Sequence, residues 1–149
     1  MISKILIASD GSKTSQKAIK YAIDLAKEVH ASIIALSVID KRMLLEKNLS
    51  ASKHLMENEE SIVSYMRKTA ENHLEEIKSL CEKNEVPVKT VTRVGYPVEE
   101  IVKQASKAKA DLLIMGARGM SPLSVQALGS VSYGIINYNS NIPVLIVRG

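Results

Sequence analysis

Three glycines near the end of the chain have the spacing of a phosphate-binding loop. Gly116 and Gly119 bracket two residues, and Gly129 precedes Ser130 at the start of a predicted helix. Gly116 lacks a Cβ, so the backbone can lie close to a sugar or base, and Gly119 permits the positive φ that aims successive amides at one anion. Gly129 lets a phosphate approach the first turn of the helix, where the amides of Ser130 and Val131 have no partner within the helix. The pattern predicts a site for a phosphorylated ligand.

Each part of this pattern also has an ordinary structural explanation. Gly-x-x-Gly occurs in many turns, and Gly-Ser before a helix is more often a simple cap. The specific signal is the order: a strand, Gly-x-x-Gly, nine residues, Gly-Ser and a helix. The chain has no Gly-x-x-x-x-Gly-Lys-(Ser/Thr) motif and no acidic pair suited to a metal cluster. We therefore expect ligand binding with very slow hydrolysis at most, and no catalytic residue.

Alternating strands and helices must position this loop. The predicted strands are β-branched, apolar runs at residues 3–8, 32–38, 88–94, 111–115 and 143–147. Helical periodicity separates them, in a segment that follows Ser12 and ends near His30, at residues 59–83, from Pro97 onward, and at residues 129–137. Such alternation predicts an α/β fold with a parallel sheet and helices on both faces.

The ends of two strands are expected to form the site. In doubly wound sheets, ligands bind beyond the carboxyl ends of the strands, where the strand order reverses. The first strand ends at Asp10-Gly11 and the fourth at Gly116, so the two ends meet if these strands are neighbours. The third run alternates between two faces, which is typical of an edge or half-exposed strand, and the last run is also placed at an edge.

Composition sets the limits of the molecule. The 149 residues form one domain, 1–149, in which residues 41–58 have weak periodicity and are expected to be a variable, mobile excursion with one helical turn. The only cysteine, Cys81, excludes an internal disulfide and fits a reducing cytoplasm. No run approaches the roughly 20 apolar residues of a membrane span. Aromatic residues are only 3%, without Trp or Phe, which argues against a platform for stacking nucleic acid bases.

The charge of the chain is uneven. Residues 57–85 hold eight Glu against four basic residues, a net −4 within a total of +4, so the rest of the chain sums to +8. A basic remainder suits an anionic ligand, although a simple solvated surface explains it as well. His30, His54 and His73 lack metal-binding spacing, and we place them at a helix end, in a loop and on a helix face.

The chain resembles the nucleotide-binding branch of the universal stress protein family, whose signature is Gly-2x-Gly-9x-Gly-(Ser/Thr). The similarity extends over nearly the whole chain and is carried by residues 5–12, 36–40, 95–101, 111–116, 129–131 and 143–147. It implies a three-layer, open, twisted, five-stranded parallel sheet that is doubly wound, with strand order 3-2-1-4-5 and the adenine nucleotide alpha hydrolase-like (HUP) fold.

The resemblance also implies a ligand, which is ATP with Mg²⁺ or Mn²⁺ bridging its phosphates. Asp10 would contact the ribose side, Val38 would offer backbone groups to the adenine edge, and the base, sugar and phosphates would be held by Met115, Gly116, Gly119, Gly129, Ser130 and Val131. Two positions depart from the pattern or vary within it. Ala8 stands where ATP-binding members often have proline, and Arg118 occupies a position of variable identity, from which its cation could reach a phosphate.

The expected role is a regulatory switch or sensor that forms a homodimer through antiparallel last strands, from Pro143 to Val147. A stress-type dimer that works through another small ligand or a protein partner remains an alternative. RNA binding is disfavoured because the Gly-x-x-Gly loop of KH modules joins two helices, whereas this one follows a strand. A phospho-receiver needs an acidic pair after the first strand, where this chain has Asp10 alone. Asp10 itself is open to two interpretations, ligand contact or helix cap.

Overall fold

The computed structural model describes residues 1–43, 59–117, 128–138 and 140–149. Its centre is a parallel sheet of five strands in the order β3-β2-β1-β4-β5, as the resemblance implied. The strands are β1 (Lys4–Ala8), β2 (Ser32–Asp40), β3 (Val88–Gly95), β4 (Leu112–Gly116) and β5 (Val144–Val147). The chain turns toward β2 after β1 and toward β5 after β4, so the strand order reverses between β1 and β4.

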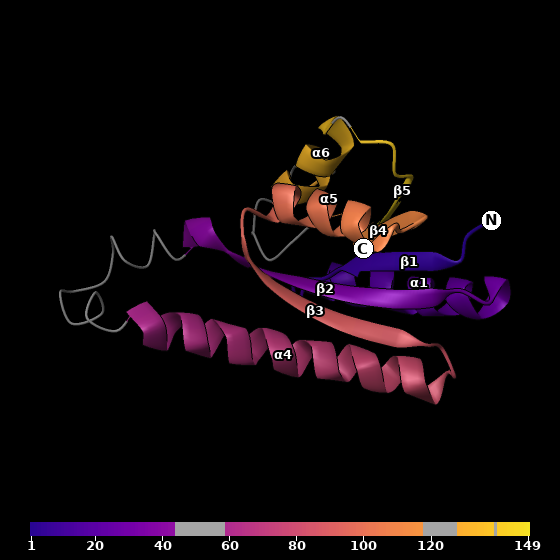
Figure 1. Ribbon diagram of the computed structural model, residues 1–149, viewed down its shortest axis with the longest axis horizontal. Coiled ribbons are helices and arrows are strands. Elements are labelled where there is room, and N and C mark those ends of the chain that lie inside the picture. Colours follow the sequence, from indigo (N-terminus) through magenta and orange to yellow (C-terminus); the bar gives the residue numbers. More distant parts are fainter. Residues whose placement is uncertain (44–58, 118–127, 139) are drawn as a thin grey trace.

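The helices form a layer on each face of the sheet (Figure 1). They are α1 (Lys13–Val29), α4 (Glu59–Lys83), α5 (Pro97–Ala108) and α6 (Ser130–Asn137). Apolar side chains of α1 and α4 pack in one hydrophobic cluster with one face of the strands, and those of α5 and α6 pack in another with the opposite face. None of the described helices is both long and apolar enough to cross a membrane.

The central strands are covered on both faces, as their continuous apolar runs predict. Ile5, Leu6 and Ile7 of β1 are completely buried. Ile5 and Ile7 belong to the α1 and α4 cluster, whereas Leu6 belongs to the α5 and α6 cluster, because successive side chains point to opposite faces. Each such side chain contributes about 1.5 to 3 kcal/mol by its burial.

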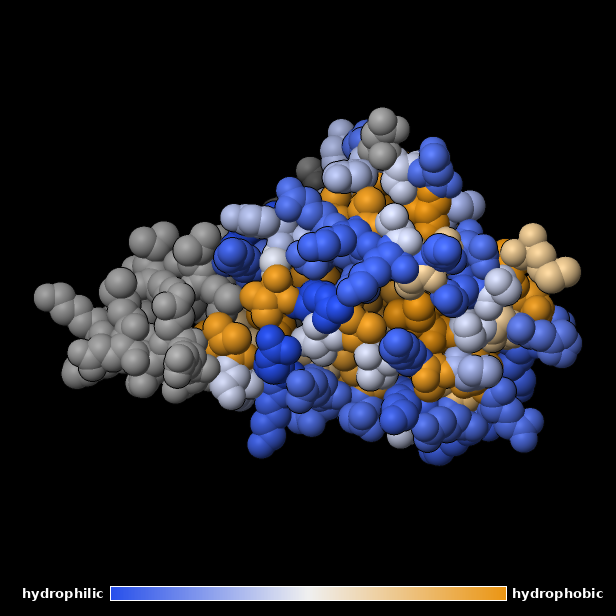
Figure 2. Space-filling model, viewed as in Figure 1, coloured by the Kyte–Doolittle hydropathy of each residue, from blue (hydrophilic) through white to orange (hydrophobic). Residues whose placement is uncertain are grey.

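The outer strands differ from the central ones. Every residue of β5 is half-buried, because this strand pairs with β4 alone. At the other edge, β3 is half-exposed along most of its length, as its alternating sequence predicts. Figure 2 shows apolar surface in the band between the polar outer sides of α4 and α5, where β3 forms the edge of the sheet. The two edge predictions are therefore confirmed.

Element ends follow local chemistry. Ser12 is the N-cap of α1, and its side chain accepts a hydrogen bond from the Ser15 amide. The helix ends at His30, which takes the left-handed conformation with φ 57°. β2 runs to Asp40, two residues beyond the predicted end, because β3 pairs with it as far as Gly95. Residues 41–43 form a helical turn, and the rest of the predicted excursion, 44–58, lies outside the described residues.

Candidate functional site

The carboxyl ends of β1 and β4 meet, as the site prediction requires. The two strands are paired, with Ala8 beside Met115 in the register. From this edge the chain enters α1 after β1 and, later, α6 after β4, and these helices cover opposite faces of the sheet. The place where the strand order reverses is the expected position of a ligand crevice in a doubly wound sheet.

Four of the predicted site residues pack in one hydrophobic cluster. They come from β1, β2, β4 and α6, and all belong to the cluster on the α5 and α6 face: Ala8, Val38, Met115 and Val131. Met115 is buried, whereas the other three are half-buried and so reach the surface. A partly open apolar wall of this kind fits the flat face of an aromatic base.

Val38 also offers backbone groups at this edge. The amide of Ser9 donates to the carbonyl of Leu36 at 3.0 Å, so the backbone groups of Leu36 face β1. Val38 is two residues further along β2 and faces the same way, because the direction of the backbone groups repeats every second residue. β1 ends at Ala8, so Val38 lies beyond the end of its neighbour. Its N–H and C=O therefore face the crevice side of β2.

No side chain of the described residues caps the amino terminus of α6. Gly129 is its N-cap and makes no side-chain cap hydrogen bond. The Gly129 amide donates to the carbonyl of Ala117 at 2.6 Å, and the buried hydroxyl of Ser132 donates to the carbonyl of Gly116 at 2.8 Å. These two bonds fix the first turn of the helix at the end of β4. The next amides, of Ser130 and Val131, are first-turn donors without a partner inside the helix, and Ser130 is exposed.

The two other helices whose caps the structure describes are less suited to an anion. The first turn of α1 is closed by the Ser12 hydroxyl, which accepts from the Ser15 amide at 3.2 Å. In α5, Pro97 has no amide to donate, and Glu99 and Glu100 place negative charge in the first turn. Of the three, α6 alone has neither a side-chain cap nor an acidic residue in its first turn.

Asp10 is not the helix cap that the sequence left open, because Ser12 takes that position. Oδ1 of Asp10 accepts from the Ser12 amide at 2.9 Å, which stabilises the turn before α1. Gly11 sits in that turn with φ +82°, a conformation that suits glycine. The Asp10 side chain is exposed and lies at the carboxyl end of β1, so its role in the turn does not bury it.

Gly116 is required by packing within the protein. A Cβ at this position would lie 3.0 Å from the carbonyl carbon of Thr14 and 3.1 Å from the amide nitrogen of Ser15. The backbone of the first turn of α1 therefore packs closely against the end of β4 at this glycine. The sequence suggested space for a ligand as the reason for this glycine, whereas the structure supplies a contact between two elements.

Two predicted residues, Arg118 and Gly119, lie outside the described residues. The anion nest expected from Gly119 and the phosphate contact expected from Arg118 therefore stay predictions. The half of the phosphate site that the structure describes consists of Gly129, Ser130 and Val131.

The sequence missed a polar contact behind the crevice. The Ser9 hydroxyl, 2.6 Å from Nε2 of His73, lies between the two predicted site residues Ala8 and Asp10. The sequence places His73 only on a helix face, and 64 positions separate it from Ser9. The position of Ser9 directly after the first strand is the one signal that could have marked it.

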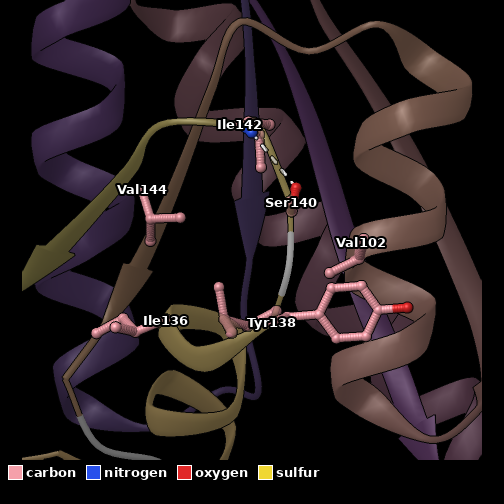
Figure 3. A pocket seen from close by; sticks show the side chains of 7 residues that line it. Val102, Ile136, Tyr138, Ser140, Ile142 and Val144 are labelled. Atoms are coloured by element: carbon pink, nitrogen blue, oxygen red, sulfur yellow. Dashed lines mark hydrogen bonds between the residues drawn. The ribbon is translucent and has the colours of Figure 1, made fainter.

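A separate cavity lies at the opposite end of the sheet. Its volume is about 230 Å³, and its lining includes Val102 of α5, Ile136 of α6 and Val144 at the start of β5 (Figure 3). The lining is mostly aliphatic, and the hydroxyl of Ser140 accepts from the amide of Ile142 at 3.3 Å. Such a lining offers little to a phosphate, so this cavity is not the predicted site.

Among the described residues, the two groups with shifted pKa values also lie away from the proposed site. Burial raises the pKa of the Cys81 thiol to about 11, and Glu82 adds to the effect. Hydrogen bonds from the Ser3 amide and hydroxyl and from the Lys4 amide lower the pKa of Asp111, just before β4. Among the described residues, no group of three or more His, Cys, Asp or Glu side chains is placed to hold a metal ion.

Comparison with known proteins identifies the family. The model of the universal stress protein family matches residues 1–148. The chain belongs to this family. Universal stress protein MJ0531 of Methanocaldococcus jannaschii is 34% identical over 99% of the chain and 83% of its own length. Universal stress protein YxiE of Bacillus subtilis is 34% identical over 99% of the chain and 100% of its own length.

Solved structures agree with the fold. One of them is the structure of MJ0577, a universal stress protein of M. jannaschii. Its TM-score to this chain is 0.86, with 35% identity over 100% of this chain and 97% of that one. Two more distant structures of the family have bound nucleotides. One is in complex with cAMP (TM-score 0.67, 23% identity, 99% of this chain and 97% of that one). The other, from Archaeoglobus fulgidus, is in complex with dAMP (TM-score 0.66, 18% identity, 99% of both chains).

Proposed function

We propose that this universal stress protein binds ATP at the carboxyl ends of β1 and β4, with Mg²⁺ or Mn²⁺ bridging the phosphates. Bound nucleotide would make it a regulatory switch or sensor that works as a homodimer. The observation that carries the proposal is the amino terminus of α6. It starts without a side-chain cap or an acidic first turn, directly beside the end of β4. Helix dipole and free amides at such a position favour a polyphosphate.

The apolar wall supports an adenine base as the other end of the ligand. Ala8, Val38 and Met115 come from three neighbouring strands and share one packing cluster with Val131 at the start of α6. A base lying on this wall would have the backbone groups of Val38 at its edge, and its phosphates would extend toward Ser130 and Val131. Asp10, exposed at the end of β1, would face the ribose.

The relatives support the same class of ligand. Two family structures are in complex with cAMP and with dAMP, and both compounds are adenine nucleotides. Their identity to this chain is below 25%, so they bear on the fold and not on individual contacts. ATP, as opposed to a monophosphate, is favoured here by the first-turn amides and by the predicted nest at Gly119.

We expect hydrolysis of ATP to be slow. The described residues of the proposed site offer backbone amides, the Ser130 hydroxyl and the carboxylate of Asp10, which already accepts from the Ser12 amide. Positioning of an attacking water normally supplies much of the rate in phosphoryl transfer, and none of these groups is arranged as an independent base. Turnover above about one per minute with excess ATP and Mg²⁺ or Mn²⁺ would contradict this part of the proposal.

The outer strand β5 supports the homodimer. It pairs only with β4, and all four of its residues, Val144 to Val147, are half-buried and apolar. The neighbouring helix adds exposed apolar surface, with Tyr133 62% and Ile136 51% exposed. A second copy paired antiparallel at this edge would cover both. Light scattering at micromolar concentration should give twice the 16.3 kDa of the chain, and a monomer would contradict the expectation.

A stress-type dimer with another ligand is the second candidate. Two observations favour it: Asp10 serves the turn before α1, and the bare Cα of Gly116 faces α1. Two positions implied to contact ATP therefore have roles in the fold. Ala8 also replaces the proline that ATP-binding members often have.

One titration distinguishes the two candidates. Calorimetry with ATP, ADP and cAMP, each with and without Mg²⁺, should show saturable binding of ATP at one site per chain that tightens with the metal. Binding of cAMP but not ATP, or no binding of any of the three, would reject ATP as the ligand and favour the second candidate. Mass spectrometry of the protein as purified provides an independent check, because tight binders often retain nucleotide.

A further inference from the structure

A short series of hydrogen bonds connects α4 to the turn that follows β1. The Nε2 atom of His73 lies 2.6 Å from the Ser9 hydroxyl, which in turn lies 3.1 Å from the Ser15 hydroxyl. Ser15 continues the series to the carbonyl of Ser12 at 2.7 Å. Ser9 is 6% exposed and Ser15 is 3% exposed, so water hardly competes for the bond between them. The series reaches the crevice from the α1 and α4 side of the sheet, behind the apolar wall.

The direction of the series follows from counting protons. Each serine hydroxyl has one proton to donate. Ser15 donates to the Ser12 carbonyl, and Ser9 donates to Ser15. With the Ser9 proton directed at Ser15, the Ser9 oxygen accepts from His73, and this arrangement corresponds to the tautomer with a proton on Nε2. In this arrangement His73 is a donor and does not activate Ser9 as a nucleophile, since a general base needs an unprotonated nitrogen.

Ser9 is the residue at which β1 becomes the turn. Its amide donates to the carbonyl of Leu36 at 3.0 Å, and this is the last backbone hydrogen bond between the carboxyl end of β1 and β2. On either side stand Ala8, part of the apolar wall, and Asp10, whose carboxylate accepts from the Ser12 amide. The His73 bond is thus the contact by which α4 fixes the turn between two predicted nucleotide-binding residues.

We propose that His73 is a positioning residue for the nucleotide site. Its Nε2–H holds the Ser9 hydroxyl, and through it the turn at Asp10, in the arrangement that a nucleotide meets. If the turn is already fixed in the free protein, binding does not cost the entropy of ordering it, and the affinity for the ligand is higher. The inference rests on the proposed nucleotide binding and adds to it a residue that contacts no ligand and lies on the opposite side of the sheet from the apolar wall.

Two substitutions of His73 separate the donor from the bulk of the side chain. His73→Phe keeps an aromatic ring without a donor, and His73→Gln places an amide N–H where the Nε2–H was. Asn72→Ala changes an exposed neighbour on the same helix and serves as the control. Two readouts are used: the dissociation constant for ATP with Mg²⁺, by calorimetry, and hydrogen exchange of the Gly11 and Ser12 amides in the free protein.

The expected pattern is rescue by the donor. His73→Phe should weaken ATP binding by roughly three- to tenfold, the equivalent of one hydrogen bond, and speed exchange at Gly11 and Ser12. His73→Gln and Asn72→Ala should stay within about twofold of the unchanged protein. Ser9→Ala also removes the bond from Ser9 to Ser15 and the bond from the Gly11 amide, so it should weaken binding at least as much as His73→Phe. Adding His73→Phe to Ser9→Ala should cause no further loss, because the bond between these two residues is already absent.

The exchange readout keeps the proposal testable if the protein binds no nucleotide. In that case the proposed function fails, and the His73 inference is judged by the free protein alone. Faster exchange in His73→Phe with recovery in His73→Gln supports the positioning role. Unchanged exchange in His73→Phe overturns it, and so does unchanged ATP affinity in a protein that binds ATP.

Discussion

The two helices that begin beside the reversal of strand order, α1 and α6, start in opposite ways. At α1, Asp10 accepts from the Ser12 amide, the Ser12 hydroxyl accepts from the Ser15 amide, and Gly11 completes the turn with a positive φ. At α6, Gly129 supplies no side chain to the cap, and its φ of −72° and ψ of 169° are open to any residue. One helix start is closed by its own side chains, whereas the other has no side-chain cap among the described residues.

The difference separates two glycines that serve the fold from the one that we propose for ligand binding. Gly11 is favoured by the positive φ of the turn, and Gly116 is favoured because the backbone of α1 leaves little room for a Cβ. Gly129 has no conformational reason to be glycine, since its φ is −72°. We propose that it is glycine because a ligand phosphate approaches the uncapped start of α6. The predictions below test this assignment, from the largest expected effect to the smallest.

The largest effect is expected at Gly129. Gly129→Leu should reduce ATP affinity by about a hundredfold or more, because a side chain at the helix start blocks the approach of phosphate to the amides. Calorimetry measures the affinity. The melting temperature should change little, since the backbone conformation at this position suits any residue. Asn137→Leu, which adds an exposed leucine at the other end of α6, is the control and should bind normally. Normal binding by Gly129→Leu would contradict the assignment.

Gly116→Ala tests the packing reason for that glycine. The new Cβ would lie 3.0 Å from backbone carbon of Thr14, which cannot move as a side-chain end could. We expect a loss of about 1 to 3 kcal/mol in the free energy of unfolding, measured by urea denaturation. An unchanged stability together with lost ATP binding would mean that Gly116 serves the ligand instead, as the sequence suggested.

Ser12→Ala removes the cap of α1 and should have the opposite profile to the change at Gly129. The loss of the bond to the Ser15 amide should cost about 1 kcal/mol of stability, a decrease of roughly 2 to 4 °C in melting temperature. ATP affinity should stay within about threefold of the original value. If Ser12→Ala abolished binding without affecting stability, the distinction between the closed and the open helix start would collapse.

The amino ends of the strands provide a comparison away from the crevice. Oδ2 of Asp111 accepts from the Ser3 amide and hydroxyl and from the Lys4 amide, each at 2.9 Å, which lowers the pKa of this carboxyl group. Its stabilising contribution is therefore complete above the ordinary carboxyl pKa and is lost as the pH falls through the lowered value.

Asp111→Asn should accordingly melt below the unchanged protein at pH 7, and the two melting temperatures should converge in acid. ATP binding at pH 7 should not change, since Asp111 lies at the opposite end of the sheet from the crevice. A gap in melting temperature that stayed constant down to low pH would show that the ionised carboxylate is not the source of the effect.

The sequence was sufficient for the framework of the fold. Continuous apolar runs located β1 and β4, and an alternating run located the edge strand β3. Element ends were harder, because pairing decides them. β2 extends to Asp40 because β3 continues beside it to Gly95. The local sequence of β2 does not predict this longer pairing.

The site prediction had two sources. Gly129 was marked by its position directly before a helix, whereas Ala8 and Met115 were implied by the family resemblance. Contacts between distant elements were not predictable. The close contact between α1 and Gly116 and the hydrogen bond between His73 and Ser9 depend on how the helices pack on the sheet. Patterns in a single sequence do not encode this packing.

The central claim is that a nucleotide phosphate binds to the open start of α6, and a crystal structure with ATP and Mg²⁺ tests it most directly. The account predicts phosphate oxygens within hydrogen-bond distance of the Ser130 and Val131 amides, with the base against Ala8, Val38 and Met115. A nucleotide whose phosphates lie at the start of α1 or α5, or crystals that take up no nucleotide at saturating concentration, would contradict it.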